Sequence, residues 1–143
     1  MAKKVLVPVD SSEHSRNAFR AAATEFESSE LVVLHVLEPF DVYAVTEQAV
    51  WDEEYLEGRE REAEQLLAEY ESLADDLGVS IETELARGSP AREIVRSADE
   101  MGADHIVIGS RGRTGIGRVL LGSVAETVAK RSPVTVTIVR GEG

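Results

Sequence analysis

The amino-acid sequence predicts a three-layer α/β/α sandwich, in which a five-stranded parallel sheet lies between two layers of helices. Short apolar segments with the length of buried strands alternate along the chain with segments whose apolar residues recur at helical spacing. A strand followed by a helix and a further strand pairs in parallel, through a right-handed crossover. We expect residues 1–143 to form a single domain, because this length is typical of one hydrophobic core.

Five segments are expected to form the strands. The first, second and fourth are apolar runs, as is usual for strands that are buried on both faces of a parallel sheet. The third alternates weakly, which places it nearer an edge of the sheet. In chain order the expected strands are Val5–Val9, Leu31–Leu37, Val79–Ala86, Asp104–Ile108 and Pro133–Val139.

Four segments are expected to form helices. Ser11 or Ser12 can cap the first helix, whose apolar stripe runs over Ala18–Phe26. Ser89 and Pro90 begin the third, because serine caps a helix and proline suits its first position. The stripes of the second, third and fourth helices cover Ala63–Leu77, Ile94–Met101 and Leu121–Val128, and the second and third end at Gly78 and Gly102.

One stretch is acidic and one is not assigned to an element. Residues 47–76 carry twelve acidic residues against Arg59 and Arg61, which we interpret as a solvated helix face. Residues 38–50 show no firm period and are expected to form a loop. The histidines His14, His35 and His105 are scattered along the chain without metal-ligand spacing, so we expect no metal site from them.

The composition is strongly acidic, with 27 acidic against 15 basic residues and a formal net charge of −12. Such a charge repels nucleic acids and anionic membranes, so neither is an expected partner. The basic residues are 12 arginines and only three lysines, which fits both a protein of a high-salt cytoplasm and an ordinary acidic cytosolic protein. Without cysteine, a signal segment or an apolar run of about 20 residues, the protein is expected to be cytoplasmic.

The most distinctive local feature is a window rich in glycine and arginine. From His105 to Ala125 the chain has no acidic residue, and it contains five glycines and three arginines, Arg111, Arg113 and Arg118. Glycines let backbone N–H groups face outward, and arginines supply positive charge. Since the window follows the fourth expected strand, we interpret it as a loop that holds an anion such as a phosphate.

The fold rule places this window beside the end of the first strand. In an open parallel sheet, ligands bind at the carboxyl ends of the strands where the strand order reverses. If the first and fourth strands are neighbours, Pro8, Val9 and Asp10 lie beside Gly109 and Ser110. Asp10 could accept hydrogen bonds from ribose hydroxyls or hold a hydrated Mg²⁺. At the end of the second strand, Val36 could form a wall for adenine, although a valine there could equally belong to the core.

Phosphates need donors, which the same window can supply. The turn Gly109–Gly115 and the helix that opens near Gly122 and Ser123 offer backbone N–H groups. Ser123 adds a hydroxyl, and Gly122 permits a close approach of the backbone to the ligand. Each residue alone also has a structural explanation: the glycines can form a tight surface loop, and Asp10 can cap the first helix.

Several nucleotide-binding motifs are excluded. A Walker A loop needs Gly-Lys, which the chain lacks, and a dinucleotide fingerprint starting at Gly115 fails because Leu120 stands at the third glycine position. Receiver domains need paired acidic residues where Asp10 stands alone, and the Ser-Gly-Gly-x-Asp-Ser loop of pyrophosphatases is absent. The window instead contains Gly-x₂-Gly-x₉-Gly-Ser, formed by Gly109, Gly112, Gly122 and Ser123.

This spacing resembles the nucleotide-binding signature of the universal stress protein family. The segments Val7-Pro8-Val9-Asp10, His35-Val36 and Ser132-Pro133-Val134 are also similar to that family, so the resemblance covers nearly the whole chain. It implies a Rossmann-like fold of the adenine nucleotide alpha hydrolase type, with strand order 3-2-1-4-5. It also implies a homodimer that binds ATP together with Mg²⁺ and acts in stress responses.

The resemblance further assigns site residues. Pro8 and Asp10 should line the adenosine, Val36 the adenine, and the turn 109–115 the phosphates. Arg111 and Arg113 are added for their positive charge and not from the resemblance. The complete set of candidate binding residues is Pro8, Val9, Asp10, Val36, Gly109, Ser110, Arg111, Gly112, Arg113, Thr114, Gly115, Gly122, Ser123, Val124 and Ala125. No catalytic residue is assigned.

Three kinds of function stay open. The first is a binding module, a dimer whose nucleotide state alters its interaction with partner proteins. The second is a slow Mg²⁺-dependent ATPase or autophosphorylating protein, and the third is a scaffold dimer without nucleotide. Pairing through the uncharged last strand, Thr135–Val139, would suit a dimer, because an exposed strand edge invites pairing.

Overall fold

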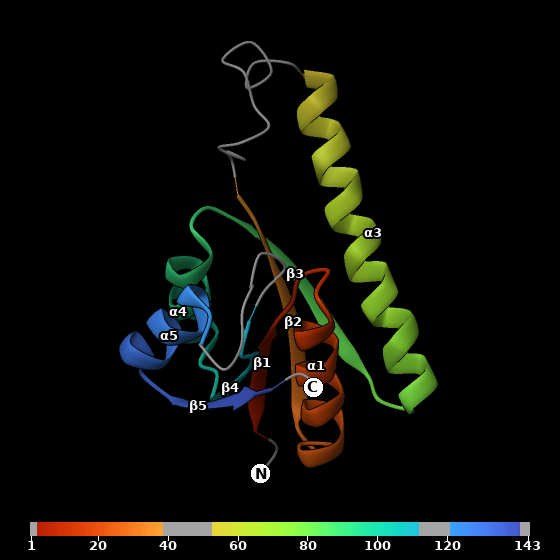
Figure 1. Ribbon diagram of the computed structural model, residues 1–143. Coiled ribbons are helices and arrows are strands. Elements are labelled where there is room, and N and C mark those ends of the chain that lie inside the picture. Colours follow the sequence, from red (N-terminus) through yellow and green to blue (C-terminus); the bar gives the residue numbers. More distant parts are fainter. Residues whose placement is uncertain (1–2, 39–52, 112–120, 141–143) are drawn as a thin grey trace.

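The protein is described here by a computed structural model, which places residues 3–38, 53–111 and 121–140. Within them, five strands form one parallel sheet in the order β3-β2-β1-β4-β5 (Figure 1). The strands are β1 (Lys4–Pro8), β2 (Glu30–Leu37), β3 (Ile81–Arg87), β4 (His105–Gly109) and β5 (Thr135–Val139). The helices are α1 (Glu13–Glu25), α3 (Glu53–Leu77), α4 (Pro90–Met101) and α5 (Ser123–Arg131). The predicted three-layer fold and its strand order are therefore confirmed.

β4 begins one residue later than expected, at His105, and β3 and β5 begin two residues later, for local reasons. The N–H of Val79 donates to the carbonyl of Ala74, which keeps Val79 in the turn that ends α3, and β3 begins at Ile81. Before β5, the Ser132 hydroxyl accepts from the N–H of Val134 and donates to its carbonyl, so this residue belongs to a turn. β5 consequently begins at Thr135 instead of Pro133.

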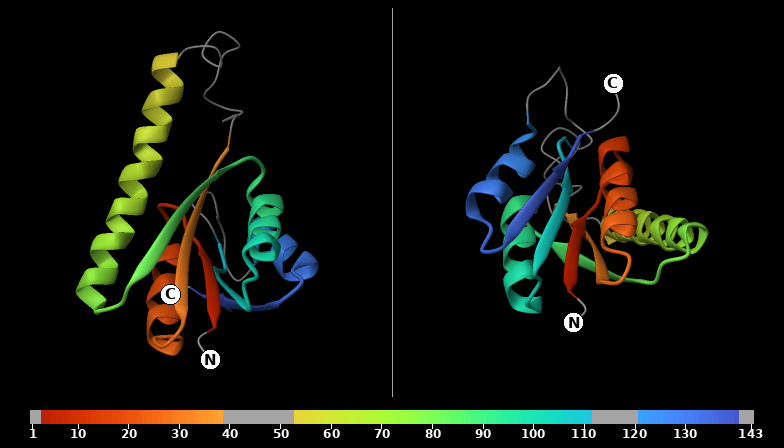
Figure 2. Two further views of the ribbon diagram at one scale, coloured as in Figure 1. Left: turned by 180° about the vertical axis from the view of Figure 1, so that it is seen from behind. Right: turned by 90° about the horizontal axis from the view of Figure 1, so that it is seen from below.

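The helices cover both faces of the sheet. Figure 2, seen from below, shows α1 and α3 on one face and α4 and α5 on the other. Alternate residues of each buried strand enter the two cores: Val7 packs in the core of Phe19 and Tyr70, whereas Leu6 packs in the core of Ile94. This double burial explains why the central strands are continuously apolar in sequence.

Helix α3 is long and is only partly supported by the sheet. Its 25 residues span about 37 Å. Its buried residues, Ala63, Leu67, Tyr70 and Ala74, recur at spacings of three and four, as expected for one face of a helix. In Figure 1 the N-terminal part of α3 projects beyond the carboxyl ends of the strands, where it can form one wall of a site.

Candidate functional site

A cavity of about 510 Å³ opens at the carboxyl ends of β1, β2 and β4. Its volume is within the usual range for small-molecule sites. Helix α3 forms one side of it, and the N-terminal turns of α4 and α5 form another. The lining residues are 8–11, 15, 34–38, 59, 62, 63, 65, 66, 69, 90, 94, 108, 109, 111 and 122–125. The cavity therefore lies at the topological switch point between β1 and β4, where the fold rule places ligands.

Most of the residues proposed from the sequence meet in this cavity. The lining includes Pro8, Val9, Asp10, Val36, Gly109, Arg111, Gly122, Ser123, Val124 and Ala125. Ser110 does not line the cavity; it is buried beside it. Gly112, Arg113, Thr114 and Gly115, together with Arg118, lie outside the described residues.

Asp10 lies in a turn that the local sequence holds closed. The Asp10 Oδ1 atom accepts a hydrogen bond of 2.8 Å from the N–H of Ser12, and the Ser12 hydroxyl caps α1 by accepting from the N–H of Ser15. Ser12, and not Asp10, is therefore the N-cap of α1, and the carboxylate of Asp10 closes the turn that precedes the helix. Because Asp10 also lines the cavity, the two roles are compatible.

Ser110 joins four elements at the end of β4. Its N–H donates to the carbonyl of Val139 at the end of β5, and its carbonyl accepts from the N–H of Gly122 before α5. Its hydroxyl lies 3.3 Å from Nδ1 of His14 in α1. Ser110 is thus a structural junction that fixes where the glycine-rich segment leaves the sheet and where α5 begins.

Packing excludes a side chain at one glycine of the sequence signature and leaves little room for one at another. A Cβ on Gly109 would lie 2.7 Å from the carbonyl oxygen of His14, because α1 crosses β4 closely at this point. A Cβ on Gly122 would lie 3.1 Å from the carbonyl oxygen of Ser110. Replacing either glycine would therefore disturb the backbone as well as a ligand, so neither is the best position for a binding test.

The start of α5 directs hydrogen-bond donors at the cavity. Gly122 is the N-cap and supplies no side-chain cap, and Ser123, Val124 and Ala125 follow as the first helical residues. N–H groups in the first turn of a helix have no partner within it, and the helix dipole makes this end positive. Arg111 lines the same end of the cavity, so this end suits an anionic group.

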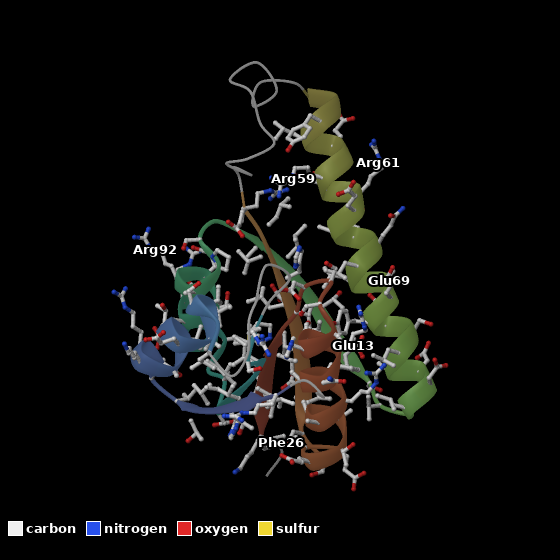
Figure 3. All side chains as sticks on the ribbon, viewed as in Figure 1. Glu13, Phe26, Arg59, Arg61, Glu69 and Arg92 are labelled. Atoms are coloured by element: carbon white, nitrogen blue, oxygen red, sulfur yellow. The ribbon has the colours of Figure 1, made fainter. Side chains whose placement is uncertain are left out.

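The wall formed by α3 was not predicted. Arg59, Glu62, Gln65, Leu66 and Glu69 line the cavity, although the acidic segment was interpreted as a solvated face. That interpretation holds for only part of the helix. In Figure 3 Arg59 and Arg61 lie on different sides of α3, and the Arg59 guanidinium donates from Nη1 to the carbonyl of Glu38, 2.5 Å away. The sequence did contain a signal for this wall, because the lining residues of α3 recur at helical spacing.

Further lining residues come from the strands β2 and β4 and from α4. His35 donates from Nδ1 to the carbonyl of Val9 over 2.8 Å, which ties the end of β2 to the end of β1. Leu34, Ile94 and Ile108 contribute apolar surface. The side of the cavity next to Val36 is thus apolar enough to take a flat heterocycle.

Comparisons with known proteins agree over the whole length of the chain. The model of the universal stress protein family matches residues 1–140. The chain belongs to the universal stress protein family. Universal stress protein MJ0531 of Methanocaldococcus jannaschii is 36% identical over 141 residues, which cover 96% of this chain and 82% of that protein. A putative universal stress protein of Staphylococcus aureus strain USA300, SAUSA300_1656, is 32% identical over 144 residues, covering 98% and 85%.

Solved structures of similar proteins show the same fold. Hypothetical protein MJ0577 superimposes with a TM-score of 0.84 at 30% identity, covering 100% of this chain and 99% of that one. UspA of Lactobacillus plantarum gives a TM-score of 0.81 at 26% identity, covering 96% and 97%. A universal stress protein solved in complex with cAMP gives a TM-score of 0.66 at 31% identity, covering 96% of this chain and 95% of that one.

The charges around the cavity of this universal stress protein are unevenly distributed. Asp10, Glu38, Glu62 and Glu69 bring carboxylates to the sides formed by β1, β2 and α3, where Arg59 also lines the cavity, whereas Arg111 lies at the opposite, glycine-rich side. Because carboxylates outnumber Arg59 along α3 and none is present among the lining residues 122–125, an anionic ligand group is favoured at the start of α5. Among the described residues, no three acidic or histidine side chains gather as a metal site, and no helix is long and apolar enough to cross a membrane.

Proposed function

We propose that this universal stress protein binds ATP in the cavity and acts as a cytoplasmic stress-response protein whose nucleotide state alters its interactions with partners. One observation carries the proposal: the cavity brings Asp10 at the end of β1 together with Gly109, Gly122 and Ser123 around the start of α5. A carboxylate for ribose and a positive helix end for phosphate are the two polar elements that a nucleotide needs.

The ligand would lie across the carboxyl edge of the sheet. The phosphates would meet Arg111, the Ser123 hydroxyl and the first N–H groups of α5, and Asp10 would accept from the ribose. Adenine would lie against Val36 and Pro8. The related structure in complex with cAMP supports an adenine nucleotide as the ligand class. Where Mg²⁺ accompanies the phosphates, Asp10 would reach it through water, since Mg²⁺ usually keeps several waters.

Homodimer formation is part of the proposal. β5 is the last strand of the sheet in the order β3-β2-β1-β4-β5, and Thr135–Val139 is exposed or half-buried along its length. Pairing of two such edges would cover backbone groups that otherwise face water. The N–H of Ser110, which follows the cavity residue Gly109, donates to the carbonyl of the β5 residue Val139, so a hydrogen bond links the end of β4 beside the cavity to the strand of the proposed dimer edge.

Titration calorimetry with ATP, AMP and cAMP tests the proposal. We expect ATP to bind, and Ser123→Ala to weaken ATP about fivefold by removing one hydroxyl donor. Ser72→Ala, which removes an exposed serine of α3 outside the cavity, should bind like the unmodified protein. Absence of binding by all three nucleotides would overturn the proposal.

The same preparation separates binding from catalysis. Incubation with Mg-ATP, followed by counting of ADP and of phosphorylated residues, distinguishes a binding module from a slow ATPase or autophosphorylating protein. We expect less than about one turnover per minute, which lies far below the usual range of enzyme rates. Faster turnover would favour the enzymatic alternative.

A further inference from the structure

One buried side chain touches the Asp10 turn without touching the cavity. Tyr70 lies in the middle of α3, is 2% exposed, and does not line the cavity. Its ring packs edge-on against Phe19 of α1, with the ring centres 5.5 Å apart. Its hydroxyl lies 2.7 Å from the hydroxyl of Ser15 and donates to the carbonyl of Asp10 over 3.3 Å. Tyr70 therefore connects α3 to the turn that carries Asp10.

The three residues form a closed ring of hydrogen bonds. The N–H of Asp10 donates to the Ser15 hydroxyl over 2.9 Å. Since the single phenolic proton of Tyr70 goes to the carbonyl of Asp10, the hydroxyl proton of Ser15 goes to the Tyr70 oxygen. Each group thus donates once and accepts once. Both backbone polar groups of Asp10 are held by this ring, and the Oδ1 atom is held separately by Ser12.

The phenol of Tyr70 is in its donating form at neutral pH, as any tyrosine is at its ordinary pKa of 10.0. In this protein the pKa is raised to about 12, chiefly because burial removes solvation from the phenolate; the negative charge of Asp10 also raises it, and the hydrogen bond with Ser15 lowers it. Tyr70 can therefore donate to Asp10 over a wider pH range than an exposed tyrosine could. A phenylalanine at this position would keep the packing against Phe19 but would leave the Asp10 carbonyl without this donor.

We propose that Tyr70 is a positioning residue for the nucleotide site, whose hydroxyl holds the Asp10 turn in the conformation that presents the Asp10 carboxylate to the ligand. The proposal rests on the proposed ATP binding. It assigns to α3 a second role besides that of a wall, because the same helix that lines the cavity also fixes the turn facing it. Affinity for the nucleotide then depends on a residue that the nucleotide does not touch.

Tyr70→Phe tests this role with two readouts. Amide hydrogen exchange of the ligand-free protein should be faster at Asp10 and Ser12 and unchanged at β4. Calorimetry should show ATP binding weakened about tenfold, as expected for a ligand group whose supporting hydrogen bond is lost. Ser15→Ala should speed exchange at the same amides. In the double variant the loss of ATP affinity should be smaller than the product of the two single losses, because both changes break one ring.

Thr83→Val is the matched control. This substitution also deletes a hydroxyl that donates a hydrogen bond to α3, in this case to Glu71 Oε1 over 3.4 Å. Thr83, however, lies outside the cavity. We expect unchanged exchange at Asp10 and unchanged ATP affinity. Equal ATP affinity in Tyr70→Phe and the unmodified protein, or equal exchange at Asp10 and Ser12, would overturn the positioning role. Failure of the unmodified protein to bind ATP would instead overturn the proposed function, and with it this role.

Discussion

Gly109 shows how one residue can belong to a sequence signature for two reasons. The signature suggested a backbone that approaches phosphate, and the structure adds a backbone that approaches α1. A Cβ on Gly109 would come within 2.8 Å of both the carbonyl carbon and the carbonyl oxygen of His14. Such contacts cannot be relieved by rotating a side chain, because the atoms belong to the main chain.

The two glycines Gly109 and Gly58 should respond to alanine in opposite directions. Gly109→Ala should destabilise the fold by about 2 kcal/mol through overpacking. Gly58 lies inside α3, where a Cβ would meet no atom nearer than 3.9 Å. Gly58→Ala should stabilise the protein by about 0.5–1 kcal/mol, because alanine favours the helix. Urea unfolding measures both, and a destabilised Gly58→Ala or an unaffected Gly109→Ala would contradict the packing described.

At the scale of elements, the C-terminal ends of α3 and α4 were predicted well, whereas the last helix was expected to include Leu121 but begins at Ser123, and the surroundings of α3 were not predicted. Gly78 and Gly102 have positive φ angles of 72° and 65° and end α3 and α4 as expected, because only local backbone geometry is involved. The stripe of α3 that lines the cavity lies beside the buried stripe of Leu67 and Tyr70. Periodicity identifies both stripes, but whether the second one faces water or a cavity depends on tertiary placement.

The site illustrates the same limit. The carboxyl-edge rule and the glycine spacing placed Asp10 and Gly122 side by side, and both residues line one cavity. Neither rule contains information about Arg59, which lines the cavity, or about Tyr70, which contacts the Asp10 turn; both residues come from α3, far along the chain. Contacts of this kind depend on the angle at which α3 crosses the sheet.

The C-terminus of α3 carries charges that oppose its dipole. Its last turn has no basic residue, and Asp75 and Asp76 are exposed there. The C-terminal end of a helix is negative, so carboxylates are unfavourable at this place. Asp76→Lys should stabilise the protein by about 0.5–1 kcal/mol in low salt, and Asp76→Asn by about half as much. Urea unfolding of the two variants checks this order; a Lys variant no more stable than the Asn variant would contradict it.

At the scale of the whole molecule, the net charge of −12 should make stability depend on salt. The last turns of α1 and α4 also lack basic residues, so three helices end in regions of negative potential. Self-repulsion weakens as the Debye length falls from about 10 Å at 0.1 M salt to about 3 Å at 1 M.

Thermal unfolding over that range of NaCl should therefore show a midpoint that rises by several degrees. The Asp76→Lys variant serves as the comparison, because it removes part of the repulsion and should rise less. An unfolding midpoint that is independent of salt, or a steeper rise in the variant, would show that repulsion from the net negative charge does not limit the thermal stability of the protein.

The strand order also has a consequence for how the molecule is made. β1 lies between β2 and β4 in the sheet. Lys4, the first residue of β1, and Asp104, just before β4, are hydrogen-bonded to each other although they stand 100 positions apart in the sequence. A nascent chain that has emerged through α4 can pair β1 with β2 and β2 with β3, but it still presents the open flank of β1 to its surroundings. Because one side of the cavity comes from β1 and the opposite side from β4 and α5, the ribosome must deliver almost the entire chain before the site can exist.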